Sequence, residues 1–282
     1  MSHLGIRPLT GALGAELSGI DATAPLGADD LHALRTAVVT HKVVVLRDQP
    51  YTVDALESLT AQLGGHGPTP FLESETDHPG IVRVVKEAEE GGFVFGGAWH
   101  TDYSFQPQPP SFTLLWSVEV PPYGGDTVWS DQALAFSRLS RGMQATLRGL
   151  RAVHSAGLAY AADGFLARTA VGRTMRINSS DEALAEQTHP VVVSHPETGE
   201  EALFVNPTYT TRIDGWTPPE SASLLGFLYQ HSVREPFTCR VHWSPHTLVI
   251  WDNRVTQHLA IDDYRGFRRE MYRSTVAGTT PR

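Results

Sequence analysis

The chain has 282 residues and a formal charge of −9, from 22 Lys+Arg against 31 Asp+Glu. Hydrophobic residues make up 41% and charged residues 19% of it, which is typical of a globular protein and excludes a disordered or fibrous one. The acidic balance argues against nucleic acid as a partner, and a single cysteine, Cys239, excludes a disulfide framework and a CxxC zinc site. No apolar run is long enough to span a membrane, and the first residues lack the apolar segment of a signal peptide. We therefore expect a cytoplasmic protein with no membrane partner.

The first third of the chain alternates helical and extended patterns. Residues 26–41 predict a helix with carboxylates in its first turn, and the apolar run 42–47 predicts a buried strand. Thr52 is a suitable N-cap for a second helix over 53–63. A loop is expected over 68–79 and a short strand over 81–85.

The rest of the chain is dominated by short strand patterns separated by turn residues. Strands are expected at 112–120, 127–130, 189–194, 202–205, 237–243, 247–251 and 268–276, with helices at 131–149 and 218–231. Residues 156–186 have weak periodicity, so we expect a long surface excursion that could serve as a lid. Many short strands with few helices predict a mostly-β sandwich or barrel with flanking helices. No change in composition marks a boundary, so we expect one domain over 1–282.

A histidine and an aspartate stand two residues apart in the segment around His100 and Asp102. On a strand, this spacing places both side chains on one face, where they could occupy adjacent positions on a metal. A third ligand would complete the two-His-one-carboxylate set that leaves positions open on Fe(II). His258 is a candidate, because it follows an apolar strand among polar turn residues. Each of these motifs, taken alone, is more often structural than metal-binding.

Two arginines alternate with a methionine near the C-terminus. On a strand, Arg269, Met271 and Arg273 share one face. If that face is the inner one, two arginines enter the interior and require anionic partners. The alternative is a solvated run of charges on the surface. Thr127 follows the Gly124-Gly125 turn and Asp126, and it opens a strand with its hydroxyl available.

Taken together and in this order, these motifs resemble one family. The chain is similar to the Fe(II)/2-oxoglutarate-dependent dioxygenases of the taurine dioxygenase/2,4-D dioxygenase (TauD/TfdA) family. The resemblance covers nearly the whole chain, and Arg269 and Arg273 follow His258 by eleven and fifteen residues. It rests chiefly on Trp99-His-Thr-Asp102, Gly124-Gly-Asp-Thr127 and Trp251-Asp-Asn-Arg-Val-Thr-Gln-His258.

The resemblance implies a fold, a site and a reaction. The fold would be a double-stranded β-helix (a cupin-like jelly roll) with helices outside, in a homo-oligomer of two or more chains. His100, Asp102 and His258 would hold Fe(II). Arg269 would pair with the distal carboxylate of 2-oxoglutarate, which its planar fork suits, and Thr127 would hydrogen-bond the same group. With O2, the enzyme would couple decarboxylation of 2-oxoglutarate to succinate and CO2 with hydroxylation of an sp3 C–H.

The charges of such a site predict an anionic substrate. The positive charges of Fe(II) and Arg269 are balanced by Asp102 and the two carboxylates of 2-oxoglutarate. Arg273 is then left over, so we expect a small organic substrate that carries a carboxylate, sulfonate or sulfate.

The similarity is greatest to the (R)-selective aryloxyalkanoate dioxygenase branch, which implies an aryloxyalkanoate-like carboxylate as substrate. An aromatic or apolar body would be held by Tyr103 and Tyr209, with Phe95 and Phe105 as further candidates. Gly96 corresponds to an asparagine that reads the amine of taurine, so taurine is not expected.

Other functions remain open at this point. A sulfonate or alkyl-sulfate dioxygenase of the same family would use the same residues. A metal-dependent hydrolase could use the two histidines and the aspartate with Zn(II) and an activated water, but would have no use for Arg269 and Thr127. A non-catalytic binding protein of the same fold is a third alternative, although such relatives usually lose a metal ligand.

Overall fold

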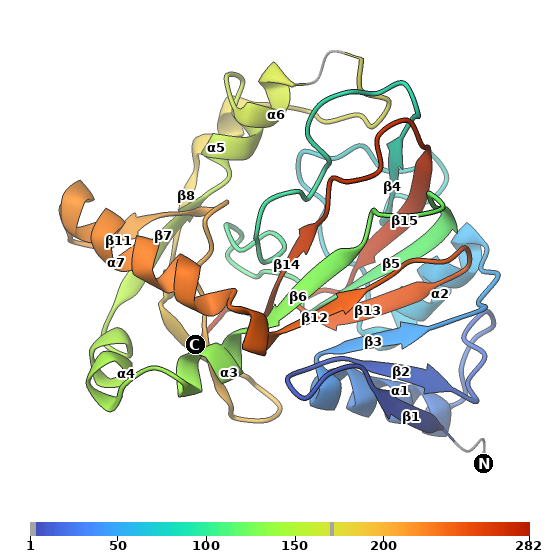
Figure 1. Ribbon diagram of the computed structural model, residues 1–282, viewed down its shortest axis with the longest axis horizontal. Helices are drawn as coiled ribbons and strands as arrows, with labels where there is room; N and C mark the ends of the chain where they lie inside the picture. The colour runs from blue at the N-terminus through green and yellow to red at the C-terminus, as the bar shows by residue number, and fades with distance from the viewer. Residues whose placement is uncertain (1–3, 170–171) are drawn as a thin grey trace.

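The computed structural model describes residues 4–169 and 172–282, and the chain is mostly β with flanking helices (Figure 1). The strands are β1 Gly5–Pro8, β2 Ala15–Ser18, β3 Val43–Leu46, β4 Ile81–Lys86, β5 Phe112–Glu119, β6 Thr127–Asp131, β7 Arg151–Ser155, β8 Glu186–Pro190, β9 Val192–Ser194, β10 Glu201–Leu203, β11 Thr210–Ile213, β12 Thr238–Val241, β13 Leu248–Asp252, β14 Thr256–Ala260 and β15 Arg269–Thr275. The helices are α1 Ala28–His41, α2 Val53–Leu63, α3 Gln132–Ser137, α4 Arg141–Leu147, α5 Gly157–Tyr160, α6 Phe165–Arg168 and α7 Pro218–Ser232, with 3-10 turns η1 Asp181–Leu184 and η2 Glu235–Phe237.

Two sheets enclose the part of the core that matters for function. The larger has the order β1-β2-β3-β13-β5-β15-β4, and the smaller has the order β12-β6-β14. Val45, Val249 and Met271 of the larger sheet belong to one buried cluster with Trp129 and Val241 of the smaller sheet. The inner face of β15, with its two arginines, therefore looks into the space between the sheets.

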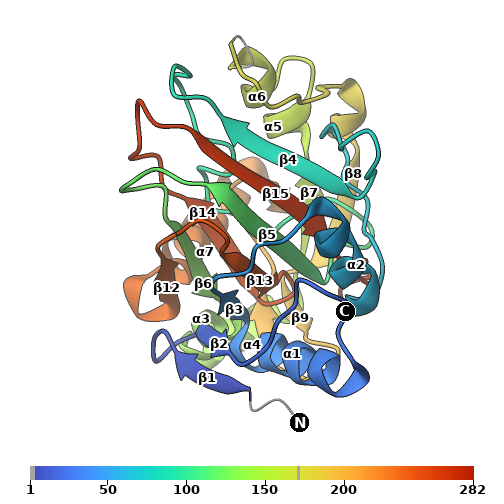
Figure 2. The same ribbon diagram turned by 90° about the vertical axis from the view of Figure 1, so that its right-hand side faces the viewer.

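The other face of the larger sheet is covered by helices. Val44 and Ile250 alternate with the inward residues and pack with Leu34 of α1 and Leu56 of α2. Figure 2 shows both helices beside these strands. Because neighbouring residues of a strand point to opposite faces, a strand buried on both sides reads as an unbroken apolar run. That is why residues 42–47 could be predicted as a strand.

Several expected elements are confirmed by the structure. The helix over 53–63 is α2, and Thr52 caps it by accepting a hydrogen bond from the Ala55 N–H at 3.2 Å. The other two long helices and most strands lie within a few residues of their expected bounds. The predicted helix over 131–149 is wrong as a single element. It is divided into α3 and α4, because Ser140 starts a new helix by accepting from the Met143 N–H.

Some strands were not predicted at all. They have only four or five residues each, and they include β1, β2, β7, β11 and β14. The expected strand at 189–194 is divided between the end of β8 and β9. So short a strand gives too few positions for the alternation of apolar and polar residues on which such predictions rest.

Residues 156–186 contain α5, α6 and η1, and residues 170 and 171 of this expected lid lie outside the described part of the chain. Figure 1 shows α5 and α6 together at one end of the molecule. Among the described residues, no helix has both the length and the apolar character needed to cross a membrane.

A buried ion pair outside the site supports one prediction on stability. Asp252 is fully buried, with His195 Nε2 at 2.9 Å and Arg254 Nη2 at 2.6 Å from Oδ2. Burial alone raises the pKa of Asp252, but the hydrogen bonds from Arg254 and His195 outweigh it and lower the pKa below its usual value. We expect Asp252→Asn to lower the free energy of unfolding by about 3 kcal/mol at pH 7.

The same ion pair predicts how this effect depends on pH. A lowered folded-state pKa stabilises the fold above the unfolded carboxyl pKa, and this stabilisation is lost as pH falls through the folded-state value. Urea unfolding should therefore show a gap between wild type and Asp252→Asn that is full at pH 7 and shrinks below about pH 4. The exposed Asp163→Asn serves as the control. An equal gap at pH 7 and pH 3 would contradict this interpretation.

Candidate metal and cosubstrate site

The nine site residues predicted from the sequence line one cavity of about 50 Å³. Thr127 comes from the start of β6, His258 from β14, and Arg269 and Arg273 from β15, so the cavity lies between the two sheets. The nine are His100, Asp102, His258, Thr127, Arg269, Arg273, Tyr103, Tyr209 and Gly96.

The two histidines and the aspartate form a compact, buried triad. His100, Asp102 and His258 each offer a ligand atom within 4.8 Å of the others. Asp102 Oδ1 lies 3.5 Å from His100 Nε2 and 3.9 Å from His258 Nε2. The backbones of the two histidines exchange hydrogen bonds at 2.8 and 3.1 Å, which keeps their side chains together. One carboxylate and two imidazoles in this arrangement fit the facial set that binds Fe(II).

The local structure differs from the expectation at both parts of the triad. Asp102 and Tyr103 lie in a turn rather than on a strand, and Tyr103 has a left-handed φ of 48°. His258 lies in the middle of β14, opposite Trp129 of β6, and not among turn residues. The three side chains nevertheless lie together, because an antiparallel β-bridge between His100 and His258 takes the place of the expected strand.

The pKa shifts of Asp102 and His258 suit metal binding. Burial alone raises the pKa of Asp102, but the charge of Arg273 and the two histidines outweigh it and lower this pKa well below its usual range. Burial, together with the charge of His100, lowers the pKa of His258 well below its usual value. An ionised carboxylate and a neutral imidazole are the forms that bind metals.

A chain of buried hydrogen bonds fixes the orientation of the aspartate. The Thr113 hydroxyl donates to Asp102 Oδ2 at 2.7 Å. Asn253 Nδ2 donates to Thr113 Oγ1 at 2.7 Å, and Trp251 Nε1 donates to Asn253 Oδ1 at 3.0 Å. The other oxygen of Asp102 is thereby left to face the histidines.

This chain predicts that Thr113→Val weakens metal binding while preserving the shape of the side chain. Loss of a partner that orients a metal ligand typically costs about 10–100-fold in affinity. Calorimetric titration of the apoprotein with Mn(II) should show a weakening of that size. Thr60→Val, a buried hydroxyl that donates to Leu56 O in α2, is the matched control. Equal Mn(II) affinity in the two variants would contradict the role of Thr113.

Arg269 fits an anionic ligand that is not part of the chain. The residue is 5% exposed, and its Nε and Nη2 have no hydrogen-bond partner among the described residues. Its guanidinium lies near the rings of Trp243 and Tyr264, at 5.7 and 5.9 Å from their centres. Thr127 Oγ1 accepts from Trp243 Nε1 at 3.0 Å, so its own proton is available to a ligand. Since an unpaired buried charge is very unfavourable, this end of the cavity is suited to a carboxylate.

Arg273 lies next to the triad and has partners within the chain. Its Nη2 is 2.7 Å from Asp102 Oδ1, and its Nη1 donates to Tyr103 Oη at 3.0 Å. The sequence-based count of charges left Arg273 unpaired because it assigned Asp102 wholly to the metal. In the structure the same carboxylate oxygen faces both the histidines and Arg273.

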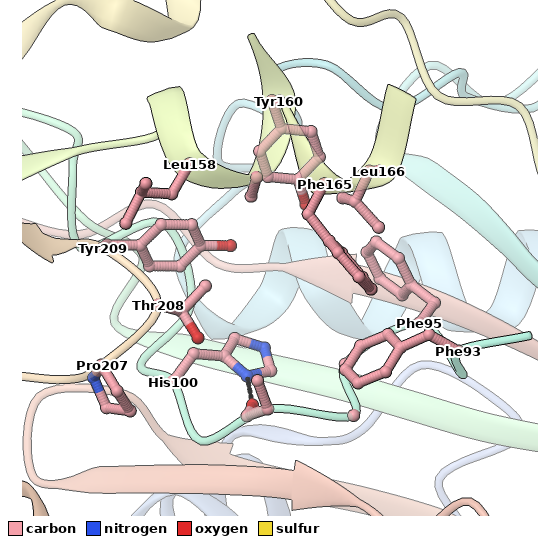
Figure 3. Close-up of a pocket in the computed structure, with 14 residues that line it drawn as sticks. Phe93, Phe95, His100, Leu158, Tyr160, Phe165, Leu166, Pro207, Thr208 and Tyr209 are labelled. Carbon is pink, nitrogen blue, oxygen red and sulfur yellow. Dashed lines mark hydrogen bonds between the residues drawn. The ribbon is translucent and has the colours of Figure 1, made fainter. Parts of the chain in front are cut away.

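A second cavity of about 210 Å³ adjoins the first and is mainly apolar. The two share His100, Tyr209, Tyr160, Phe95 and Gly96. Figure 3 shows aromatic side chains surrounding the space beside the His100 ring, with the Tyr209 hydroxyl directed into it. The walls on the far side are Leu158, Tyr160, Phe165 and Leu166 of α5 and α6.

Some residues that line the aromatic cavity were not predicted from the sequence, and one predicted lining residue lies elsewhere. Tyr160, Leu158 and Phe165 were not singled out, and their one signal was their position in the segment expected to be a lid. Phe105 lines neither of these two cavities and instead packs on Tyr209, with ring centres 4.9 Å apart.

The fold, the triad and an arginine suited to a carboxylate fit a metal-dependent oxygenase, and comparison with known proteins identifies the family. The family model "Taurine catabolism dioxygenase TauD, TfdA family" matches residues 5–275. The chain belongs to this family, and it is an α-ketoglutarate (2-oxoglutarate)-dependent dioxygenase that uses Fe(II), 2-oxoglutarate and O2.

Individual relatives span nearly the whole chain. An alpha-ketoglutarate-dependent sulfate ester dioxygenase from Pseudomonas putida is 32% identical, over 99% of this chain and 91% of the relative. The alpha-ketoglutarate-dependent 2,4-dichlorophenoxyacetate dioxygenase of Cupriavidus pinatubonensis is 28% identical, over 96% of each chain. The crystal structure of a taurine dioxygenase from Burkholderia xenovorans superposes with a TM-score of 0.81 and 34% identity, over 99% of this chain and 92% of that one.

Proposed function

We propose that this enzyme hydroxylates an sp3 carbon of a small organic anion with an apolar body. His100, Asp102 and His258 hold the metal, and Arg269 and Thr127 bind the distal carboxylate of 2-oxoglutarate. The observation that carries the proposal is a single buried cavity that joins a two-His-one-carboxylate triad to an arginine without an anionic partner.

The residues of the chain contribute binding, orientation and exclusion of water. When bound, Fe(II) and 2-oxoglutarate supply the O2-dependent oxidation that couples succinate and CO2 formation to hydroxylation. His100, Asp102 and His258 would hold the metal, and Thr113 keeps Asp102 in place through its hydrogen bond. Arg269, at another wall, fixes the cosubstrate by its charge and fork geometry. The aromatic walls keep water away from the reacting carbon.

The substrate's anionic group is assigned to Arg273 and its body to the aromatic cavity. Arg273 is 6% exposed, and it is held by Tyr103 beside the triad. An anion bound there places the neighbouring carbon close to the metal ligands. The apolar lining by Phe93, Phe95 and Leu166 offers no partner to an amine such as that of taurine.

Aryl or alkyl sulfate esters are the first candidates, and aryloxyalkanoates the second. The sequence pattern alone favoured the carboxylates. The match over nearly the full length of the sulfate ester dioxygenase supports the first class, and the 2,4-dichlorophenoxyacetate enzyme supports the second. Both classes combine one anionic group with an apolar body, as the two cavities require.

We extend the proposal to the fold and the setting of the enzyme. The two sheets packed around one apolar cluster support a double-stranded β-helix within one domain. Residues 156–186 would serve as a lid, because α5 and α6 supply one wall of the aromatic cavity. A homo-oligomer in the cytoplasm remains our prediction from the sequence.

A substrate panel tests the proposal. Succinate formation and O2 uptake would be measured with Fe(II), 2-oxoglutarate and hexyl sulfate, phenyl sulfate, 2-phenoxypropionate or taurine, with hexanol as the uncharged match to hexyl sulfate. We expect coupled turnover with a sulfate or aryloxyalkanoate and little with taurine or hexanol. Equal turnover of hexanol and hexyl sulfate, or a preference for taurine, would contradict the proposed substrate class.

A further inference from the structure

A second buried cation stands beside Arg269. Lys86 ends β4 and lies directly opposite Arg269 in the antiparallel pairing of β4 with β15. Directly paired residues of neighbouring strands project to the same side of a sheet, a few ångströms apart. Both side chains lie against the ring of Tyr264, with Lys86 Nζ 4.9 Å and the Arg269 guanidinium carbon 5.9 Å from its centre.

Neither cation has an anionic partner within the described residues. Lys86 Nζ is buried and, like Arg269 Nε and Nη2, has no hydrogen-bond partner there. Two like charges paired across strands repel each other, and burial makes the repulsion stronger. A pair of this kind is stable when an anion lies between or beside the two charges.

The neighbouring carboxylate of the chain is already engaged. Lys86, Glu90 and Arg269 line a small cavity of about 20 Å³ that shares Arg269 with the cavity of the metal site. Glu90 Oε1 accepts from the backbone N–H groups of Thr174 and Glu87, at 2.9 and 3.1 Å. The charge of Arg173 acts on the same carboxylate. Both backbone donors bind Oε1 of Glu90, and no ion pair joins Glu90 to Lys86 or Arg269 among the described residues, so the need for an anion at the two cations remains.

We propose that Lys86 is a further binding residue for 2-oxoglutarate and donates to the distal carboxylate alongside Arg269. This inference rests on the assignment of Arg269 under the proposed function. The distal carboxylate would then be the anion that balances the charges of Lys86 and Arg269. The position of Lys86 at the end of a strand would not by itself indicate this role. Selectivity for a dicarboxylate over a monocarboxylic 2-oxo acid follows, since two charges depend on that group.

Binding to the Zn(II)-loaded full chain, which needs no turnover, tests the proposal. Calorimetry would compare 2-oxoglutarate with 2-oxopentanoate, which lacks the distal carboxylate. Because a hydrogen bond to a charged group is involved, we expect Lys86→Met to raise the Kd of 2-oxoglutarate roughly 10- to 100-fold and to leave that of 2-oxopentanoate unchanged. Lys86→Arg, which keeps the charge, should stay close to wild type.

The Arg269→Met variant distinguishes a failure of the inference on Lys86 from a failure of the proposed role of Arg269. If Arg269→Met weakens 2-oxoglutarate and Lys86→Met does not, the role of Lys86 is wrong and the proposed function stands. If neither variant changes 2-oxoglutarate binding, the assignment of Arg269 fails, and the inference on Lys86 fails with it. An equal loss for both 2-oxo acids in Lys86→Met would mean a general effect on the fold and would also overturn the inference.

The lysine content offers a second test on the unmodified chain. Lys42 and Lys86 are the lysines of the sequence, so the Nζ resonances of 15N-lysine-labelled protein can be assigned by Lys86→Met. Lys42 Nζ is bound to Asp131 at 2.8 Å and serves as the internal reference. Addition of N-oxalylglycine, an analogue with the same two carboxylates, should shift the Lys86 signal and leave that of Lys42 in place. An unmoved Lys86 signal at saturation would overturn the proposal.

Discussion

Replacing His258 by alanine is expected to abolish coupled turnover and to remove tight metal binding. His258 supplies one of the three ligand atoms of the triad, so its removal leaves His100 and Asp102 alone at this site. The loss of metal affinity should exceed the roughly 10–100-fold that follows removal of a residue that only supports a ligand. Titration with Mn(II), followed by succinate formation with Fe(II), would measure both effects.

The chain offers a matched control for this variant. His78, with Asp54 and Glu57, forms the other group among the described residues that could hold a metal, and it is partly exposed. His78→Ala should keep both metal affinity and turnover. If His78→Ala lost activity and His258→Ala kept it, the triad would not be the metal site.

Replacing Arg273 by alanine is expected to have the second largest effect, greater on the organic substrate than on 2-oxoglutarate. Removing one partner of a buried charge pair costs about 2–5 kcal/mol, which corresponds to a fall in kcat/KM of roughly 30-fold to a few thousand-fold. The binding of 2-oxoglutarate should persist, because Arg269 and Thr127 line the part of the cavity assigned to that ligand. Steady-state kinetics with the best compound of the panel, beside calorimetry of 2-oxoglutarate, would show the separation.

Arg273→Lys and Arg269→Ala complete this experiment. Arg273→Lys keeps the charge but loses the fork that reaches both Asp102 and Tyr103, so it should recover part of the activity. Arg269→Ala should weaken 2-oxoglutarate instead. Unchanged turnover in Arg273→Ala, together with abolished turnover in Arg269→Ala, would show that the substrate's anion does not bind to Arg273.

The features that could be predicted from the sequence depend on local spacing. The alternation of Arg269, Met271 and Arg273 placed the two arginines on one face, because the pleat of a strand fixes the side to which each residue points. The structure shows that this face is the inner one, which the sequence had left open. The unbroken apolar run of β3 likewise indicated burial on both faces. The triad was assembled from motifs separated by 156 positions, and there the family resemblance supplied what spacing could not.

The features that could not be predicted depend on contacts between distant segments. Tyr160 lines the aromatic cavity because α5 lies beside the site, and no local sequence pattern predicts this contact. Thr113 and Asn253 are ordinary polar residues until the fold brings them to Asp102. In the sequence, Lys86 has the pattern of a solvated charge at the end of a strand. Only the pairing of β4 with β15 shows that it lies beside the buried Arg269.

The stoichiometry of the reaction tests the central claim most directly. O2 uptake, 2-oxoglutarate consumption, succinate formation and product formation would be measured together with Fe(II) and the preferred sulfate ester or aryloxyalkanoate, with the His258→Ala variant as the blank. We expect equal amounts of all four, dependence on Fe(II), and loss in the variant. Product formation with Zn(II) in the absence of 2-oxoglutarate and O2 would contradict it and would identify the site as that of a metal-dependent hydrolase.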